Sequence, residues 1–263
     1  MGQETLRKRK LNMHRIAAAW ILAALMLGGC GSGEKERQEL RLQGIEQLEA
    51  GNYEEAIKSF EGALELSAKV IGEFELDILK YRAEAEYGSG DYAAAAYTYD
   101  VLSQVDEERD EYRIRMCRLF VMAGQLDEAV KAYEKIYAAA PEGKETAEIL
   151  LSLGQALTDK GRFDEAIGLY EKAVSGGMQS GEIYNRMAAC ELEAGEIDSA
   201  LRYLEQGIAV NDSSVMDSLL LNQAAAYEKK LDFKRALAVL EQYCAAYGVT
   251  ETVQKEMDFL RSR

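Results

Sequence analysis

Few side chains in this sequence can perform nucleophilic or acid–base chemistry. The only histidine is His14, and the only thiols are those of Cys30, Cys117, Cys190 and Cys244. A thiolate is a nucleophile and a metal ligand, but Ser-His-Asp and Cys-His catalysis, and most zinc sites, also need a histidine. No histidine follows position 14. We therefore expect no catalytic residue, no metal site and no cofactor, and we expect that the protein is not an enzyme.

The other candidates for chemistry have simpler explanations as structural residues. Cys117, Cys190 and Cys244 lie far apart, form no CxxC motif and have apolar neighbours, so we interpret them as buried free thiols. Adjacent acids such as Glu54-Glu55 and Asp127-Glu128 could form an acid–base pair. They fall where helices are predicted to begin, however, and the helix dipole favours carboxylates at that position.

The composition predicts a helical protein that does not bind nucleic acid. Of the 263 residues, 48% are hydrophobic and 8% are aromatic, and the single proline is Pro141. Alanine, leucine, glutamate and lysine are abundant, which favours helices over sheets. The formal charge is -15, and residues 1–29 hold five basic side chains against one acid, so the remainder is more acidic still. Such a chain repels nucleic acid, and its charge is explained either by solubility alone or by attraction of a basic protein partner.

The beginning of the chain has the organisation of an export signal. Residues 1–15 are basic, and the apolar run at 16–27 is shorter than the roughly 20 residues of a membrane-spanning helix. The sequence Leu27-Gly28-Gly29-Cys30 follows, and it resembles the bacterial lipoprotein signal. The resemblance implies cleavage before Cys30 and lipid attachment to its thiol. The protein would then be anchored on the extracytoplasmic side of the cell membrane, or in an outer membrane if the cell has one. An ordinary signal peptide and an uncleaved anchor are the alternatives.

A pattern of small and large residues recurs six times at intervals of 34 to 39 residues. Its reference residues are Gly51, Gly90, Gly124, Gly161, Gly195 and Leu231. Five residues later the chain has alanine in every copy, at Ala56, Ala95, Ala129, Ala166, Ala200 and Ala236. Seven residues before the reference stand the small residues Gly44, Ala83, Cys117, Gly154, Ala188 and Ala224. Nine residues after it stand the large residues Phe60, Tyr99, Tyr133, Tyr170, Leu204 and Leu240. A period near 34 indicates a repeated helical hairpin.

The pattern has a physical interpretation as helix, turn and helix. The reference glycine adopts the left-handed backbone that ends a helix, and the small residues let the two helices approach closely. The large residues fill the space between hairpins. These columns resemble the tetratricopeptide-repeat family. The resemblance implies an all-α, right-handed superhelical solenoid of about six helix-turn-helix hairpins with a C-terminal capping helix.

The predicted domains follow from these two resemblances. They are a signal peptide at 1–29, a flexible tether at 30–36, the array of six repeats at 37–248 and the capping helix at 249–263. The first interval is 39 residues long, which predicts a longer second helix or a longer loop around 67–75.

In the tetratricopeptide-repeat family, ligands are usually peptide or protein segments held in a concave groove lined by the first helices. The resemblance places Lys80, Tyr87, Arg118, Gln155, Thr158 and Asn185 in that groove. Glu84, Glu111, Glu148 and Glu182 are expected beside them, so the face is mixed and somewhat acidic. Some family members clamp a peptide's terminal carboxylate with paired lysines and asparagines. Here Lys80, Arg118 and Asn185 lie in three different repeats, and acidic residues are expected between them. That clamp is therefore not expected.

The function most consistent with these features is a membrane-anchored scaffold that binds a protein or peptide segment within a cell-envelope complex. One alternative is an assembly factor for outer-membrane or pilus machinery, of the pilotin or barrel-assembly kind. Another is a lipoprotein that captures a glycan or solute, although the only tryptophan, Trp20, lies in the export signal.

Overall fold

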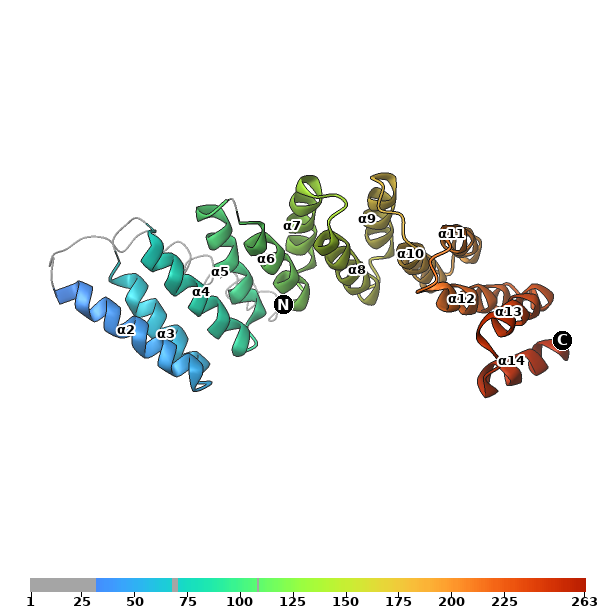
Figure 1. Cartoon of the computed structure of the whole chain (residues 1–263), viewed down its shortest axis with the longest axis horizontal. Coiled ribbons are helices and arrows are strands. Elements are labelled where there is room, and N and C mark those ends of the chain that lie inside the picture. Colours follow the sequence, from blue (N-terminus) through green and yellow to red (C-terminus); the bar gives the residue numbers. More distant parts are fainter. Residues whose placement is uncertain (1–31, 68–70, 108) are drawn as a thin grey trace, which may run out of the picture. The chain divides into compact units, whose positions relative to one another are not determined.

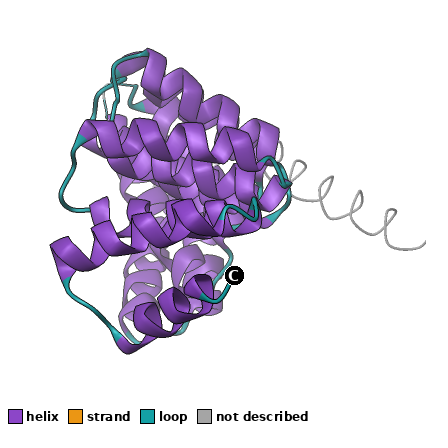
Figure 2. Cartoon of the chain, turned by 90° about the vertical axis from the view of Figure 1, so that its right-hand side faces the viewer, coloured by secondary structure: helices purple, strands orange, loops and turns teal. Residues whose placement is uncertain are grey.

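A computed structural model describes residues 32–67, 71–107 and 109–263. Within these residues, all the regular secondary structure is α-helical. Figure 2 shows these helices joined by short loops. The predicted signal peptide and Cys30 lie outside the described residues. Among the described residues, no helix is both long enough and apolar enough to cross a membrane.

The helices follow one another as hairpins, each with a first and a second helix, and one helix is added at the end (Figure 1). The first helices are α2 (Ser32–Glu49), α4 (Glu73–Gly88), α6 (Asp110–Met122), α8 (Lys144–Asp159), α10 (Gly181–Ala194) and α12 (Met216–Lys229). The second helices are α3 (Tyr53–Glu65), α5 (Tyr92–Val105), α7 (Leu126–Ala139), α9 (Phe163–Ser175), α11 (Ile197–Val210) and α13 (Phe233–Tyr247). The added helix is α14 (Glu251–Arg261).

The predicted all-α array of helical hairpins with a capping helix is confirmed. The capping helix α14 buries Val253, Met257 and Leu260, which lie on one face of the helix. The long first interval is a longer loop, since α3 ends at Glu65 and α4 begins at Glu73.

The chain divides into two compact units, unit 1 up to Gln125 and unit 2 from Leu126 to Arg263. Within each unit, helices pack against their neighbours in sequence, and in unit 1 the first helices α2 and α4 also touch. In unit 2, α8 contacts α10 and α10 contacts α12. Consecutive first helices therefore form a shared surface in unit 2.

The turns between paired helices have the backbone that the repeat pattern predicts. All five reference glycines have positive φ, from 68° at Gly124 to 87° at Gly195. Leu231 occupies the same place in the last turn with φ 63°. A left-handed backbone costs a residue with a Cβ roughly 1–2 kcal/mol, so this leucine is strained. Its side chain is 73% exposed and gains little from packing.

The repeated alanines and small residues allow close packing inside each hairpin. The six column alanines, Ala56 to Ala236, have no exposed surface. A Cβ added at Gly44 would lie 2.5 Å from the ring of Phe60, and one at Gly154 would lie 2.1 Å from the hydroxyl of Tyr170. In these two hairpins the large residue of the second helix therefore covers the small residue of the first, where we had placed it between hairpins.

The predicted flexible tether at 30–36 is wrong for the part that the structure describes, because α2 begins at Ser32. Glu34 lies in the first turn, where the dipole favours a carboxylate, and it pairs with Arg37 at 2.9 Å. Arg37 in turn reaches Glu75 of α4 at 2.8 Å and stacks over the ring of Phe74. These contacts hold the start of α2 against the second hairpin, which a composition of small and polar residues did not predict.

Candidate functional site

The pocket that contains predicted groove residues lies in unit 2, at the contact between the first helices α8 and α10. Its volume is about 360 Å³. The lining residues are Gln155, Thr158 and Asp159 of α8, Phe163 and Tyr170 of α9, and Arg186, Ala189 and Glu193 of α10. Gln155 and Thr158 were predicted to face a groove, and the structure brings both to this pocket. The site is named the α8–α10 pocket below.

Gln155 is the centre of the hydrogen-bond network around the α8–α10 pocket. Its side-chain oxygen accepts from Nη1 of Arg186 at 2.6 Å, and its side-chain nitrogen donates to Asp159 at 2.7 Å. Nε of Arg186 also donates to Glu182 at 2.7 Å. One amide therefore separates the guanidinium of α10 from the carboxylate of Asp159, although both line the same pocket.

Thr158 lines the pocket beside this hydrogen-bond network. Its hydroxyl donates to the carbonyl of Gly154 at 2.8 Å and lies 2.8 Å from Sγ of Cys190. Burial raises the pKa of the Cys190 thiol, and burial likewise raises the pKa of the Tyr170 phenol. Both groups are therefore neutral at physiological pH and act as packing residues of the pocket.

The surface formed by the first helices continues from α10 to α12. The amide of Asn222 donates to the side-chain oxygen of Asn185 at 2.8 Å. Asn185, another predicted groove residue, thus faces α12 and lies outside the lining of the α8–α10 pocket. Three first helices of unit 2 are linked across this surface by side chains that retain further hydrogen-bonding capacity.

The remaining predicted groove residues belong to unit 1. Lys80 and Tyr87 lie on α4, and Arg118 lies on α6. The side chain of Tyr87 is 52% exposed, and its ring lies 5.5 Å from that of Tyr92. Arg118 is exposed and Lys80 is partly exposed. Each of these residues therefore exposes a polar group on its own first helix, α4 or α6.

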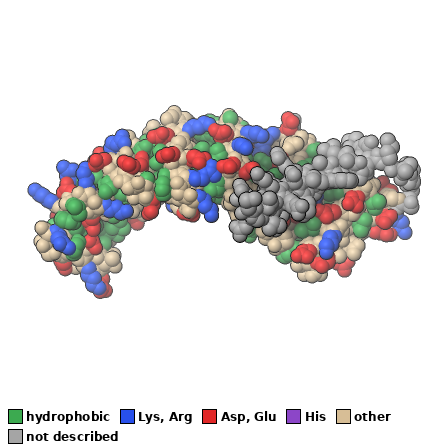
Figure 3. Space-filling model, turned by 180° about the vertical axis from the view of Figure 1, so that it is seen from behind, with side chains coloured by type: hydrophobic (Ala, Val, Ile, Leu, Met, Phe, Trp, Pro, Cys, Tyr) green, Lys and Arg blue, Asp and Glu red, His purple; other side chains and the backbone are tan. Residues whose placement is uncertain are grey.

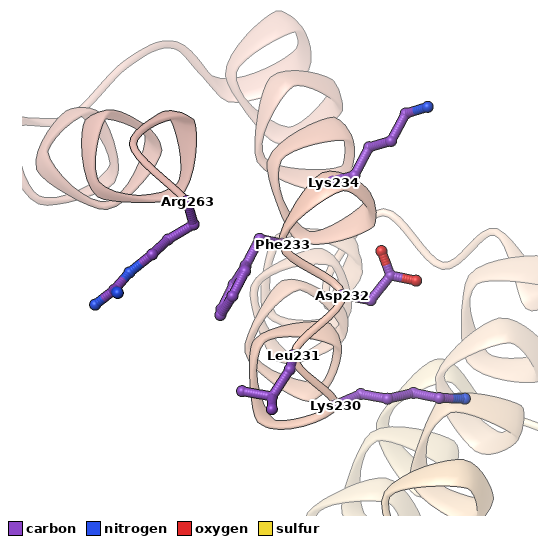
Figure 4. Close-up of a pocket in the computed structure, with 6 residues that line it drawn as sticks. All are labelled: Lys230, Leu231, Asp232, Phe233, Lys234 and Arg263. Atoms are coloured by element: carbon purple, nitrogen blue, oxygen red, sulfur yellow. The ribbon is translucent and has the colours of Figure 1, made fainter.

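A second hollow lies near the C-terminal end, between the last turn of the repeats and α14. Figure 4 shows Leu231, Phe233 and Arg263 on one side of the chain, while Lys230, Asp232 and Lys234 point to the other. Lys230 is paired with Asp198. Because its lining residues point in opposite directions, this hollow does not gather polar groups around one ligand position.

The thiols of the described residues form no disulfide with one another, and Cys117 and Cys190 are buried. Burial raises the pKa of Cys117 to about 12, so its thiolate is scarce at neutral pH. Cys244 is partly buried and lies 3.6 Å from the sulfur of Met257. Within the described residues, no group of three acid, histidine or cysteine side chains is placed to hold a metal ion.

Comparison with protein families agrees with this architecture. Three models described as "Tetratricopeptide repeat" match residues 41–104, 112–179 and 157–222, which together cover more than half of the chain. The chain belongs to the tetratricopeptide-repeat family. Proteins of this family are generally non-enzymatic scaffolds for protein–protein interaction. A search of curated proteins returned no match.

Several solved structures share the repeat fold at low sequence identity. The TPR2AB domain of yeast Sti1, in its pHSP90 complex, is 18% identical, with 89% of this chain and 98% of that chain covered and a TM-score of 0.39. A thermophilic TPR protein from Thermus thermophilus is 16% identical, with 72% and 100% covered and a TM-score of 0.44. A tetratricopeptide repeat protein from Parabacteroides merdae is 17% identical, with 86% and 84% covered and a TM-score of 0.39.

The sequence analysis did not identify the charged residues of the α8–α10 pocket. Asp159, Arg186 and Glu193 line the pocket with Gln155, but none of them was singled out. Arg186 and Asn222 do share a signal, because each stands nine residues before the reference residue of its repeat. That column contains a different residue type in most repeats, so only the contacts between neighbouring first helices reveal its importance.

Proposed function

We propose that this protein is a lipid-anchored scaffold that binds a protein segment on the first helices of its repeats and performs no chemistry itself. The observation that carries the proposal is the linked polar surface of unit 2, where Arg186 reaches Gln155 and Asn222 reaches Asn185. Each link joins two consecutive first helices. A segment lying across them would meet preformed donors and acceptors without requiring the side chains to reorganise.

Membership of the tetratricopeptide-repeat family supports this role, because the family provides interaction surfaces for other proteins. The absence of histidine after position 14 agrees with a role in binding alone. The acidic composition favours a basic partner. On the face shown in Figure 3, however, acidic and basic side chains are intermingled, so local arrangement must decide which partner is accepted.

The lipid anchor is the second part of the proposal and rests on the sequence before residue 32. The chain would be cleaved between Gly29 and Cys30, and the thiol of Cys30 would be acylated. More than one acyl chain would hold the protein stably at the extracytoplasmic side of the membrane. The scaffold would then present its repeats to partners of a cell-envelope complex at the membrane surface.

Site-specific photocrosslinking in cells tests the binding surface. A photoreactive amino acid at Tyr87, Gln155 or Asn185 should crosslink to one recurrent protein, while a probe at the exposed Glu205 of the second helix α11 should not. Equal crosslinking from all four positions, or none from the first helices, would contradict the proposed surface.

Membrane fractionation tests the anchor separately. Cys30→Ser should remove the protein from the membrane fraction, whereas Cys244→Ser should remain in the membrane like the unchanged protein. If Cys30→Ser stays membrane-bound and the unchanged protein is also unprocessed, the lipoprotein proposal is wrong.

A further inference from the structure

We propose that the α8–α10 pocket accepts a lysine or arginine side chain of the bound segment. This inference rests on the proposed function and names the chemistry that the binding surface selects. It follows from the shape of the pocket, from the pairing of its one cation and from the two carboxylates at its edge.

The lining of the pocket combines an apolar wall with charged groups. Phe163, Tyr170 and Ala189 supply the apolar part, and Asp159 and Glu193 are the exposed acids. A lysine or arginine has the matching construction, because its aliphatic stem packs on apolar surface while its charged end stays near water. An aromatic ring face within about 6 Å also attracts a cation. The volume of about 360 Å³ is within the range of small-ligand pockets.

Arg186 does not make the pocket a site for anions. Its guanidinium is bound to Glu182 at 2.7 Å and to Gln155 at 2.6 Å. The carboxylate of Glu182 offsets its charge, and the two contacts engage donors that an incoming carboxylate or phosphate would need. An anion that bound the remaining guanidinium donors would also approach the carboxylates of Asp159 and Glu193, which line the same pocket.

The two acids, in contrast, keep their charge available. Asp159 accepts a hydrogen bond from the neutral amide of Gln155 at 2.7 Å. Within the part of the chain that the structure describes, neither Asp159 nor Glu193 forms an ion pair. The Gln155 amide lies between Arg186 and Asp159 and so prevents the arginine from neutralising that carboxylate. The pocket therefore contains one paired cation and two unpaired anions, a balance that a single added cation improves.

The experiment uses the full chain and a displayed library of random dodecapeptides. Peptides selected on the protein should carry a lysine or arginine and should crosslink from a photoreactive residue at Asn185, beside the pocket. Replacing that lysine by norleucine keeps most of the aliphatic stem and removes the charge. We expect this replacement to weaken binding at least tenfold, because norleucine has no ammonium to interact with the two carboxylates.

A double variant tests whether the two carboxylates are responsible. In Asp159→Asn with Glu193→Gln, the lysine and norleucine peptides should bind within about twofold of each other. The matched control, Glu145→Gln with Glu205→Gln, removes two exposed acids outside the pocket and should keep the tenfold preference. Circular dichroism should show the same melting temperature for both double variants within a few degrees.

The outcomes separate this inference from the proposed function. Peptides that crosslink from Asn185 but bind equally with lysine or norleucine would overturn the lysine pocket and leave the binding surface intact. A tenfold preference that survives in Asp159→Asn with Glu193→Gln would also overturn it. Failure to select any peptide, or crosslinks only from positions outside the first helices, would overturn both proposals.

Discussion

Units 1 and 2 are built from the same hairpin but stabilise it in different ways. Both buried carboxylates of the described residues, Glu75 and Glu86, lie in unit 1. Each is paired there, Glu75 with Arg37 and Glu86 with Arg82. The buried polar side chains of unit 2 are neutral, Thr146 and Gln223, while a large apolar cluster extends from α10 to α14.

The difference shows that charged side chains can have two environments in the same repeat pattern, either buried in ion pairs or at an open pocket. In unit 1 the charged side chains are used inside the fold, where Arg82 reaches Glu86 at 2.9 Å and Thr98 donates to Glu86 at 2.6 Å. In unit 2 the arginine and acids around Gln155 lie at an open pocket. Charged side chains are therefore paired inside the fold of unit 1, whereas in unit 2 they line an open pocket.

The largest effect should come from breaking the buried ion pair of unit 1 with Arg82→Met. Glu86 is 2% exposed, and its charge would lose its cationic partner. Removing one member of a buried pair typically costs about 3–5 kcal/mol. Hydrogen exchange should then be faster in α4 and α5, with unit 2 little changed. A matched exposed pair in unit 2, broken by Lys172→Met, should cost less than about 0.5 kcal/mol.

The loss in Arg82→Met should depend on pH. Burial raises the pKa of Glu86 above its usual value, while Arg82 lowers it, so the variant should have a still higher pKa. A raised carboxyl pKa means that the folded state binds a proton more tightly, and stability falls as pH rises through that range. The deficit should therefore be full at neutral pH and shrink on acidification. The double variant Arg82→Met with Glu86→Gln should show no such pH dependence from this site.

A smaller and equal effect is expected from overpacking the hairpin contact in each unit. Gly44→Ala would press on Phe60, and Gly154→Ala would press on Tyr170. Each should cost about 1–3 kcal/mol in urea denaturation. Gly154→Ala with Tyr170→Leu recreates the alanine and leucine of the fifth and sixth repeats and should recover much of the loss. A cost confined to one unit would show that the hairpins differ in more than their charges.

The smallest effect concerns the turns, where unit 2 has the one strained exception. Leu231→Gly should raise the free energy of unfolding by about 1 kcal/mol, because glycine adopts a positive φ without steric cost. The exposed leucine contributes little packing to offset this gain. Thermal denaturation would measure the gain, and Gly161→Leu should lose a similar amount. A melting temperature lowered by Leu231→Gly would indicate that the leucine makes a stabilising contact.

Much of the fold could be predicted because every copy of the repeat restricts the size of the side chain, or the backbone conformation, at the same positions. The column alanines are fully buried and the reference glycines have positive φ, as their residue types implied. The start of α2 could not be predicted in this way. Its first residues are small and polar, and their helix is secured by Arg37, which contacts a glutamate 38 residues away.

The proposed binding surface was predictable only in part. Helical spacing placed Gln155 and Thr158 on one side of α8, and both line the α8–α10 pocket, because that side follows from the period of the helix itself. Whether Gln155 contacts Arg186 depends on how α8 and α10 pack, and sequence spacing does not specify that distance. Asn185 illustrates the same limit, since it contacts Asn222 of α12 instead of lining the pocket.

The sequence by itself determined the hairpins, their turns and their close-packed columns, because helix period, small side chains and glycine backbone act over a few residues. The tertiary structure alone decided which charges are buried in pairs and which remain at a pocket. Glu86 and Glu193 are the same residue type on first helices, yet one is enclosed by Arg82 and Thr98 and the other is exposed. That difference arises from neighbouring helices, whose contacts set the burial and the partners of each carboxylate.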